Sequence, residues 1–234
     1  QAGQLEEAAA GFERVLQLNP RGAKPLYQLA ELAMLRREFA RAADLLEQGL
    51  RLDADRAAFL VKLGEARIEM QQFDAAERAL NDALQVRADQ PLAHYNLALV
   101  HEARGRWPQA AAAYEAEIAA HPALFQPHFN LAKVLTRLGR PAEALPHFRA
   151  AVDANPQFGT GYLFLAKASL DVGDLDAAAA AATRGLAANP EPAMIPLGHY
   201  VLADVYSRMG RDAEAARHAA AGKRAERAQA QGAR

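Results

Sequence analysis

A 34-residue internal repeat constrains the fold of this chain more than any other feature of its sequence. Residues 94–122 read HYNLALVHEARGRWPQAAAAYEAEIAAHP, and residues 128–156 read HFNLAKVLTRLGRPAEALPHFRAAVDANP. The aligned pairs are His94 and His128, Asn96 and Asn130, Leu97 and Leu131, Ala98 and Ala132, Gly105 and Gly139, Ala110 and Ala144, Tyr114 and Phe148, and Pro122 and Pro156. Self-similarity at a fixed period of about 34 residues predicts a stacked array of helix–turn–helix units.

Apolar residues inside each period recur at the spacing of α-helices. Leu26, Leu29 and Ala30 are separated by three and four residues, which places them on one face of a helix and excludes a strand. A small residue also recurs in each second helix, where we expect two helices to cross so closely that only a Cβ fits. Its copies are Ala42, Ala76, Ala110, Ala144 and Ala178.

The period divides the 234 residues into a leading half repeat, six repeats and a tail. In the first two full repeats the turn glycine is replaced, by Arg37 and Gln71. The expected order is a half repeat with a second helix only (1–22), repeats 23–56, 57–90, 91–124, 125–158 and 159–192, an insertion (193–195), a sixth repeat that forms a polar C-terminal cap (196–229), and a tail (230–234). A solenoid of this kind has no single central core.

This pattern resembles the tetratricopeptide repeat (TPR) family over almost the whole chain. The family has a large residue, Leu and a small residue in its first helix, then Ala, an aromatic and a closing Pro, and the third and fourth repeats match nearly every position. The resemblance implies an all-α TPR solenoid, a right-handed superhelix of antiparallel helix pairs. It also implies that the first helices line a concave face that binds an extended peptide or a partner helix.

The resemblance assigns candidate binding residues to fixed positions of the first helices. One position reads Tyr27, Val61, Tyr95, Phe129, Leu163 and Tyr200, and the position one turn further reads Glu31, Glu65, Leu99, Lys133, Lys167 and Asp204. The predicted concave face combines aromatic anchors, amides and a basic middle that favours an acidic partner segment. Its residues are Tyr27, Tyr95, Asn96, Leu99, Phe129, Asn130, Lys133, Arg137, Leu163, Lys167 and Tyr200.

One alternative for these positions stays open: the aromatic residues could instead fill space between adjacent first helices. A carboxylate clamp and a metal site are disfavoured. Asn96 and Asn130 occupy the central position of the two-carboxylate clamp of some TPR domains, but Thr160 stands where that clamp needs Lys, so we do not expect one. His94, His128 and His199 share one repeat position, lie on different helices and lack a ligand at i+4, so we expect packing and not metal binding.

Composition and motifs argue against several other functions. The chain has no Cys, which excludes disulfides and thiolate chemistry. The net charge of −1 gives no attraction to nucleic acid, and no apolar run is long enough to span a bilayer. No catalytic arrangement of carboxylates, no nucleophile motif and no phosphate-binding loop is present, so we expect neither an enzyme nor a cofactor.

The sequence therefore favours a non-catalytic protein-interaction scaffold that binds a peptide or helix. One alternative is the recruitment portion of a larger bacterial enzyme, because residues 196–211 and 94–107 weakly resemble TPR arrays of large bacterial proteins, including sulfatase-like fusions. The other is self-association through the open side of the half repeat. The chain starts inside a repeat without Met, so we interpret it as a fragment, and the sequence does not decide between cytoplasm and periplasm.

Overall fold

The computed structural model describes residues 2–52 and 55–232, and this part of the chain is built from α-helices with one short 3₁₀ segment and no strand. The chain forms two compact units, Gln1–Ala120 and His121–Arg234. The first unit contains α1 (Ala2–Leu18), α2 (Ala23–Leu35), α3 (Phe39–Leu50), α4 (Arg56–Glu69), α5 (Phe73–Val86), α6 (Ala93–Ala103) and α7 (Trp107–Ala120). The second contains α8 (Phe125–Arg137), α9 (Pro141–Ala154), α10 (Gly159–Asp171), α11 (Leu175–Ala187), η1 (Pro192–Met194), α12 (Ile195–Arg208) and α13 (Asp212–Gly232).

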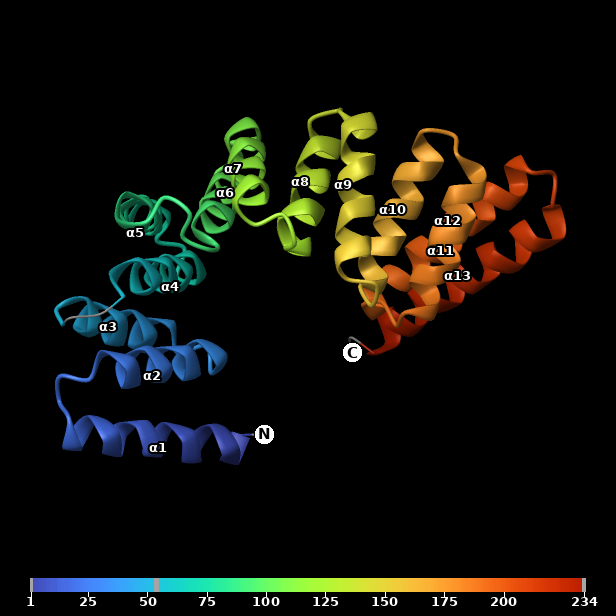
Figure 1. The fold of residues 1–234 in the computed structure, drawn as a ribbon. Helices are drawn as coiled ribbons and strands as arrows, with labels where there is room; N and C mark the ends of the chain where they lie inside the picture. Colours follow the sequence, from blue (N-terminus) through green and yellow to red (C-terminus); the bar gives the residue numbers. More distant parts are fainter. Residues whose placement is uncertain (1, 53–54, 233–234) are drawn as a thin grey trace. The chain divides into compact units, whose positions relative to one another are not determined.

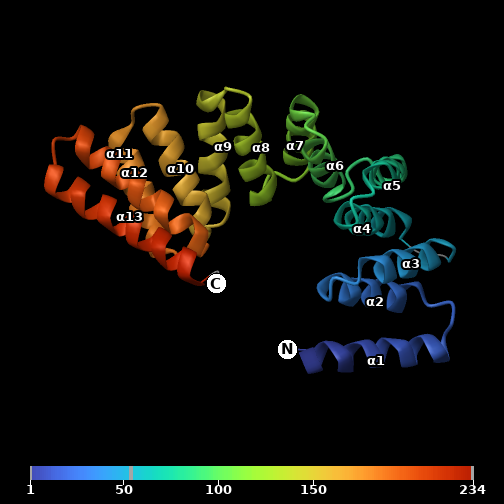
Figure 2. The ribbon, with the colours of Figure 1, turned by 180° about the vertical axis from the view of Figure 1, so that it is seen from behind.

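Helices that follow one another in the chain pack side by side within each unit (Figure 1). In the first unit α2 pairs with α3, α4 with α5 and α6 with α7, while α1 packs on α2. In the second unit α8 pairs with α9, α10 with α11 and α12 with α13, and the same pairs are visible from behind (Figure 2). The predicted all-α array of helix pairs is confirmed.

The turn inside each helix pair has one backbone geometry, which explains the recurring glycine. Gly105, Gly139, Gly173 and Gly210 have φ between 68° and 84°. The residue after each of them donates its N–H to the carbonyl five residues earlier, as Arg140 does to Leu135 at 2.9 Å. This helix-ending motif requires a left-handed residue, which glycine adopts without strain. Arg37 and Gln71 adopt the same conformation, with φ of 61° and 58°.

Small residues pack the helix pairs together, as the repeat predicts. Each of the recurring alanines of the second helices is completely buried. Larger residues fill the space between them, such as Leu46 and Leu80 in the first unit and Leu131 and Phe148 in the second. These alanines are Ala42, Ala76, Ala110, Ala144 and Ala178.

The last part of the chain differs from the expected repeat limits. The expected insertion 193–195 lies in and directly after η1, and α12 begins at Ile195. Helix α13 continues to Gly232, so it includes most of the expected tail 230–234, of which residues 233–234 lie outside the described residues. The reason is composition, because residues 212–231 contain no Pro and are rich in Ala, with several Arg, Glu and Gln residues, all of which favour helix.

Candidate partner-binding site

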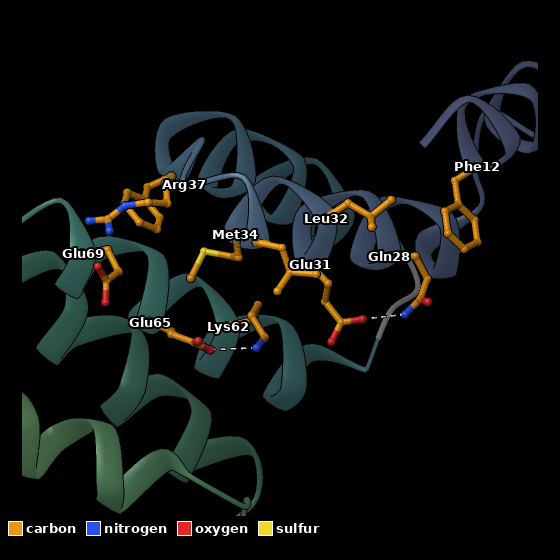
Figure 3. A pocket seen from close by; sticks show the side chains of 11 residues that line it. Phe12, Gln28, Glu31, Leu32, Met34, Arg37, Lys62, Glu65 and Glu69 are labelled. Carbon is orange, nitrogen blue, oxygen red and sulfur yellow. Dashed lines mark hydrogen bonds and ion pairs between the residues drawn. The ribbon is translucent and has the colours of Figure 1, made fainter. Parts of the chain in front are cut away.

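The first unit contains a hollow of about 560 Å³ beside the first helices of its leading repeats (Figure 3). Side chains of α2 and α4 form most of its wall, and α1, α3 and the turn after α2 complete it. The lining residues are Phe12, Gln28, Glu31, Leu32, Met34, Leu35, Arg37, Phe39, Lys62, Glu65 and Glu69.

Helical spacing explains why α2 offers an open face to this hollow. Gln28, Glu31 and Leu35 are three and four residues apart, so they lie along one side of the helix. The buried stripe of α2 uses other positions, including Leu26 and Leu29, which pack in the core. As a result the lining of the hollow includes an exposed apolar side chain, Leu35, which is 69% exposed.

Charges around the hollow are mixed, with an excess of carboxylates. Two contacts organise them, both drawn in Figure 3: Gln28 Nε2 donates to Glu31 Oε2 at 2.7 Å, and Lys62 Nζ lies 2.7 Å from Glu65 Oε2. Burial by itself lowers the pKa of Lys62, but the hydrogen bond and charge of Glu65, together with the charges of Tyr27 and Glu31, outweigh burial and raise that pKa. Lys62 therefore stays charged and compensates Glu65. The charged lining residues are Glu31, Glu65, Glu69, Arg37 and Lys62.

The residues predicted for the concave face in the first unit are mostly covered by neighbours. The ring of Tyr27 lies 5.1 Å from the ring of buried Phe59, and burial raises the pKa of Tyr27. Tyr95 packs at 5.7 Å from the ring of Tyr114. Both tyrosines are half-buried, as is Leu99, whereas Asn96 is only 5% exposed.

In the second unit, Phe129 belongs to a cluster of phenylalanines. Its ring centroid lies 4.8 Å from that of Phe158, 5.2 Å from Phe164 and 5.9 Å from Phe148. These contacts join α8 to α9, to α10 and to the residue that precedes α10. The aromatic rings therefore fill space between helices, which supports the packing interpretation for Phe129.

The other candidates of the second unit divide between core and surface. Leu163 is completely buried and offers no surface to a partner. Tyr200 is half-buried, its ring covers Gly222, and its hydroxyl donates to Glu226 at 2.7 Å. Asn130 is half-buried and Arg137 is exposed.

The predicted basic middle is exposed, but its lysines have neighbours. Lys133 Nζ lies 5.5 Å from the ring centroid of Phe129, a cation–π distance. Lys167 forms an ion pair with Asp171 on the next turn of α10. The partner-binding role of these residues remains a prediction.

A buried carboxylate that the repeat pattern did not reveal holds the start of α6. Glu117 of α7 is 0% exposed and accepts hydrogen bonds from the backbone N–H groups of Leu92 at 2.8 Å and Tyr95 at 3.1 Å. Helix N-termini have free N–H groups and favour negative charge, so Glu117 takes the place of a side-chain cap. The only signal in the sequence was an acid, Glu117, on a second helix rich in alanine.

No group of three or more His, Asp or Glu able to hold a metal ion occurs in the part of the chain that the structure describes. Among the same residues, no helix is long and apolar enough to cross a membrane. The hollow itself offers apolar area, carboxylates and two cations.

Comparisons with known proteins identify the class. The sequence model of the tetratricopeptide repeat matches residues 61–125 and 129–191, more than half of the chain. The chain therefore belongs to the tetratricopeptide repeat family, as the repeat pattern predicted. Proteins of this family are generally non-catalytic interaction scaffolds that bind proteins or peptides. No curated protein matches the sequence significantly.

Solved structures with the same fold share little sequence with this chain. PilF from Pseudomonas aeruginosa is 19% identical with a TM-score of 0.70, over 81% of this chain and 86% of PilF. The C-terminal part of a TPR protein from Cytophaga hutchinsonii is 13% identical with a TM-score of 0.69, over 92% and 89%. YrrB, a TPR protein with an unusual peptide-binding site, is 18% identical with a TM-score of 0.57, over 78% and 94%. At this identity the likeness shows the fold alone.

Proposed function

We propose that this chain is a non-catalytic interaction module and that the hollow between α2 and α4 receives a segment of a partner protein. The observation that carries the proposal is the combination of apolar area, at exposed Leu35 and half-buried Met34, with carboxylates in one hollow. Family membership supports the general role, and the peptide-binding site of YrrB shows that this fold can hold such a segment.

The chemistry of the hollow favours a partner segment with an apolar side chain next to basic residues. Leu35 and Met34 would cover the apolar side chain, and removing that area from water supplies the affinity. Lys62 already compensates Glu65, so Glu31 and Glu69 are the acids left to attract a cation. Arg37 lies 5.8 Å from the ring centroid of Phe39 and is held at the edge of the hollow. Charge complementarity of this kind sets the specificity and speed of association more than the affinity.

The hollow favours a basic partner segment, whereas the basic residues predicted in the second unit favour an acidic one. Lys133 and Arg137 are exposed there, and Lys167 forms an ion pair with Asp171. Surface ion pairs and exposed lysines contribute little to affinity by themselves. We therefore place the principal site in the first unit.

The proposal is tested with two short fluorescent peptides, one with Leu flanked by Lys and one with Leu flanked by Glu. Fluorescence anisotropy should show tighter binding of the basic peptide, and Leu35→Ser should weaken it roughly tenfold, the effect of losing one buried apolar contact. Glu31→Gln combined with Glu69→Gln should weaken the basic peptide and reduce its sensitivity to salt.

Val86→Ser is the matched control, because Val86 is also an exposed apolar residue at the end of a helix of the same unit and lies outside the hollow. It should leave binding unchanged. Equal binding of the two peptides, or an effect of Val86→Ser as large as that of Leu35→Ser, would contradict the site. Tighter binding of the acidic peptide would contradict the site in the first unit and favour one at Lys133 and Arg137.

A further inference from the structure

Two pairs of histidines face each other inside the second unit, each across one helix pair. His128 of α8 and His147 of α9 place their Nδ1 atoms 3.1 Å apart, and His199 of α12 and His218 of α13 do the same at 3.1 Å. The ring centroids are 5.3 Å apart in the first pair and 5.4 Å apart in the second. The same geometry thus occurs twice, at equivalent positions of the fourth and sixth expected repeats.

The third repeat shows that the pair depends on both members. In each pair the second histidine follows the first by 19 residues. His94 occupies the position equivalent to His128 and His199, but the residue 19 positions after it is Ala113. From the sequence, we expect the histidines of the first helices to have a packing role. The structure shows that two of them, His128 and His199, face a second histidine on the next helix.

We propose that each pair is a two-imidazole site for a divalent transition-metal ion of the Zn²⁺ class. Two imidazole nitrogens that share one Zn²⁺ at about 2.0–2.1 Å in tetrahedral geometry lie about 3.3 Å apart, close to the separation already present. A metal ion needs only a small rotation of the rings to replace the hydrogen bond between them. Imidazole nitrogen is a preferred ligand for this class of ion.

The surroundings allow an ion to enter and leave room for further ligands. All four histidines are half-buried, so solvent reaches each pair. The described residues offer no group of three or more metal-ligating side chains, so water or a side chain of a bound partner completes the coordination. A bound ion would connect the first and second helix of one repeat and stabilise that pair.

The test is calorimetric titration of the untagged chain with ZnCl₂, together with melting temperatures in ZnCl₂ and in EDTA. We expect two bound ions, and an increase of about 4 °C or more in melting temperature at saturating Zn²⁺ relative to EDTA. His147→Gln should remove one ion, His218→Gln the other, and the double variant both. Circular dichroism in EDTA shows that each variant is folded, and the change on adding Zn²⁺ is compared within each variant.

His94→Gln is the control, because His94 has the same repeat position without a second histidine. It should keep both ions and the full increase in melting temperature. Absence of binding to the unchanged chain would overturn the proposal and leave each pair as a hydrogen bond between neutral rings. Binding that survives in the double variant would overturn it as well.

Discussion

At the scale of the residue, one backbone conformation defines the turn of every helix pair. Four of these turns use glycine, and the first two full repeats use Arg37 and Gln71 in the same left-handed conformation. An L-residue with a side chain pays about 1–2 kcal/mol for this conformation. The turns of the first two full repeats therefore carry local strain that the four glycine turns avoid.

Gln71→Gly should stabilise the protein by about 0.5–1 kcal/mol, because glycine removes the strain but gains freedom in the unfolded chain. The measurement is urea-induced unfolding followed by circular dichroism. Gly139→Ala is the reverse change and should cost about 1 kcal/mol, which is a backbone effect because a Cβ there meets no atom within 4 Å. A loss of stability in Gln71→Gly would show that its side chain contributes more than its backbone costs.

At the scale of the helix, stability depends on close approach within each pair. The five recurring alanines are completely buried where second helices pack, whereas Ala215 has the equivalent position in α13 and is only half-buried. Helix α13 packs mainly on α12 and η1. An alanine at this repeat position is therefore tightly packed in the earlier repeats but only partly covered in the last one.

Ala144→Leu should destabilise the protein by about 1–3 kcal/mol, because the larger side chain does not fit between α9 and its neighbours. Ala215→Leu should change stability by less than about 0.5 kcal/mol, as is usual for partly exposed positions. Chemical denaturation of the two variants in parallel gives both values. Equal costs would mean that α13 is packed as tightly as α9.

At the scale of the whole molecule, the two units have different stabilising contacts. In the first unit, ion pairs connect neighbouring repeats, such as Arg41 with Glu13 at 2.9 Å and Arg104 with Glu77 at 2.7 Å. In the second, the phenylalanine cluster around Phe129 has this role. Repeat proteins gain stability from contacts between neighbouring repeats and not from one shared core. A destabilising substitution should therefore affect mainly its own repeat and the adjacent repeats.

Hydrogen exchange measured by mass spectrometry should show this locality. Ala42→Leu should increase exchange mainly in α2, α3 and α4, while Ala178→Leu should act mainly on α10, α11 and α12. Each variant is the control for the other. Uniform loss of protection along the chain in either variant would mean that the array unfolds as one cooperative unit.

The sequence by itself determined the features that repeat along the chain. Helix pairs, the glycine turns and the buried alanines follow from local backbone geometry and helical spacing, which a 34-residue period displays directly. The family could be recognised for the same reason.

The tertiary structure decided which of the candidate binding residues are exposed and which are covered by other helices. Phe129 lies against Phe158 and Phe164, Leu163 is completely buried, and these facts depend on contacts between helices that the period does not encode. The same is true of the cap formed by Glu117, the histidine pairs and the hollow between α2 and α4. Each arises where side chains far apart in sequence meet, and the physical reason is that packing between helices, not spacing along one helix, sets their burial and partners.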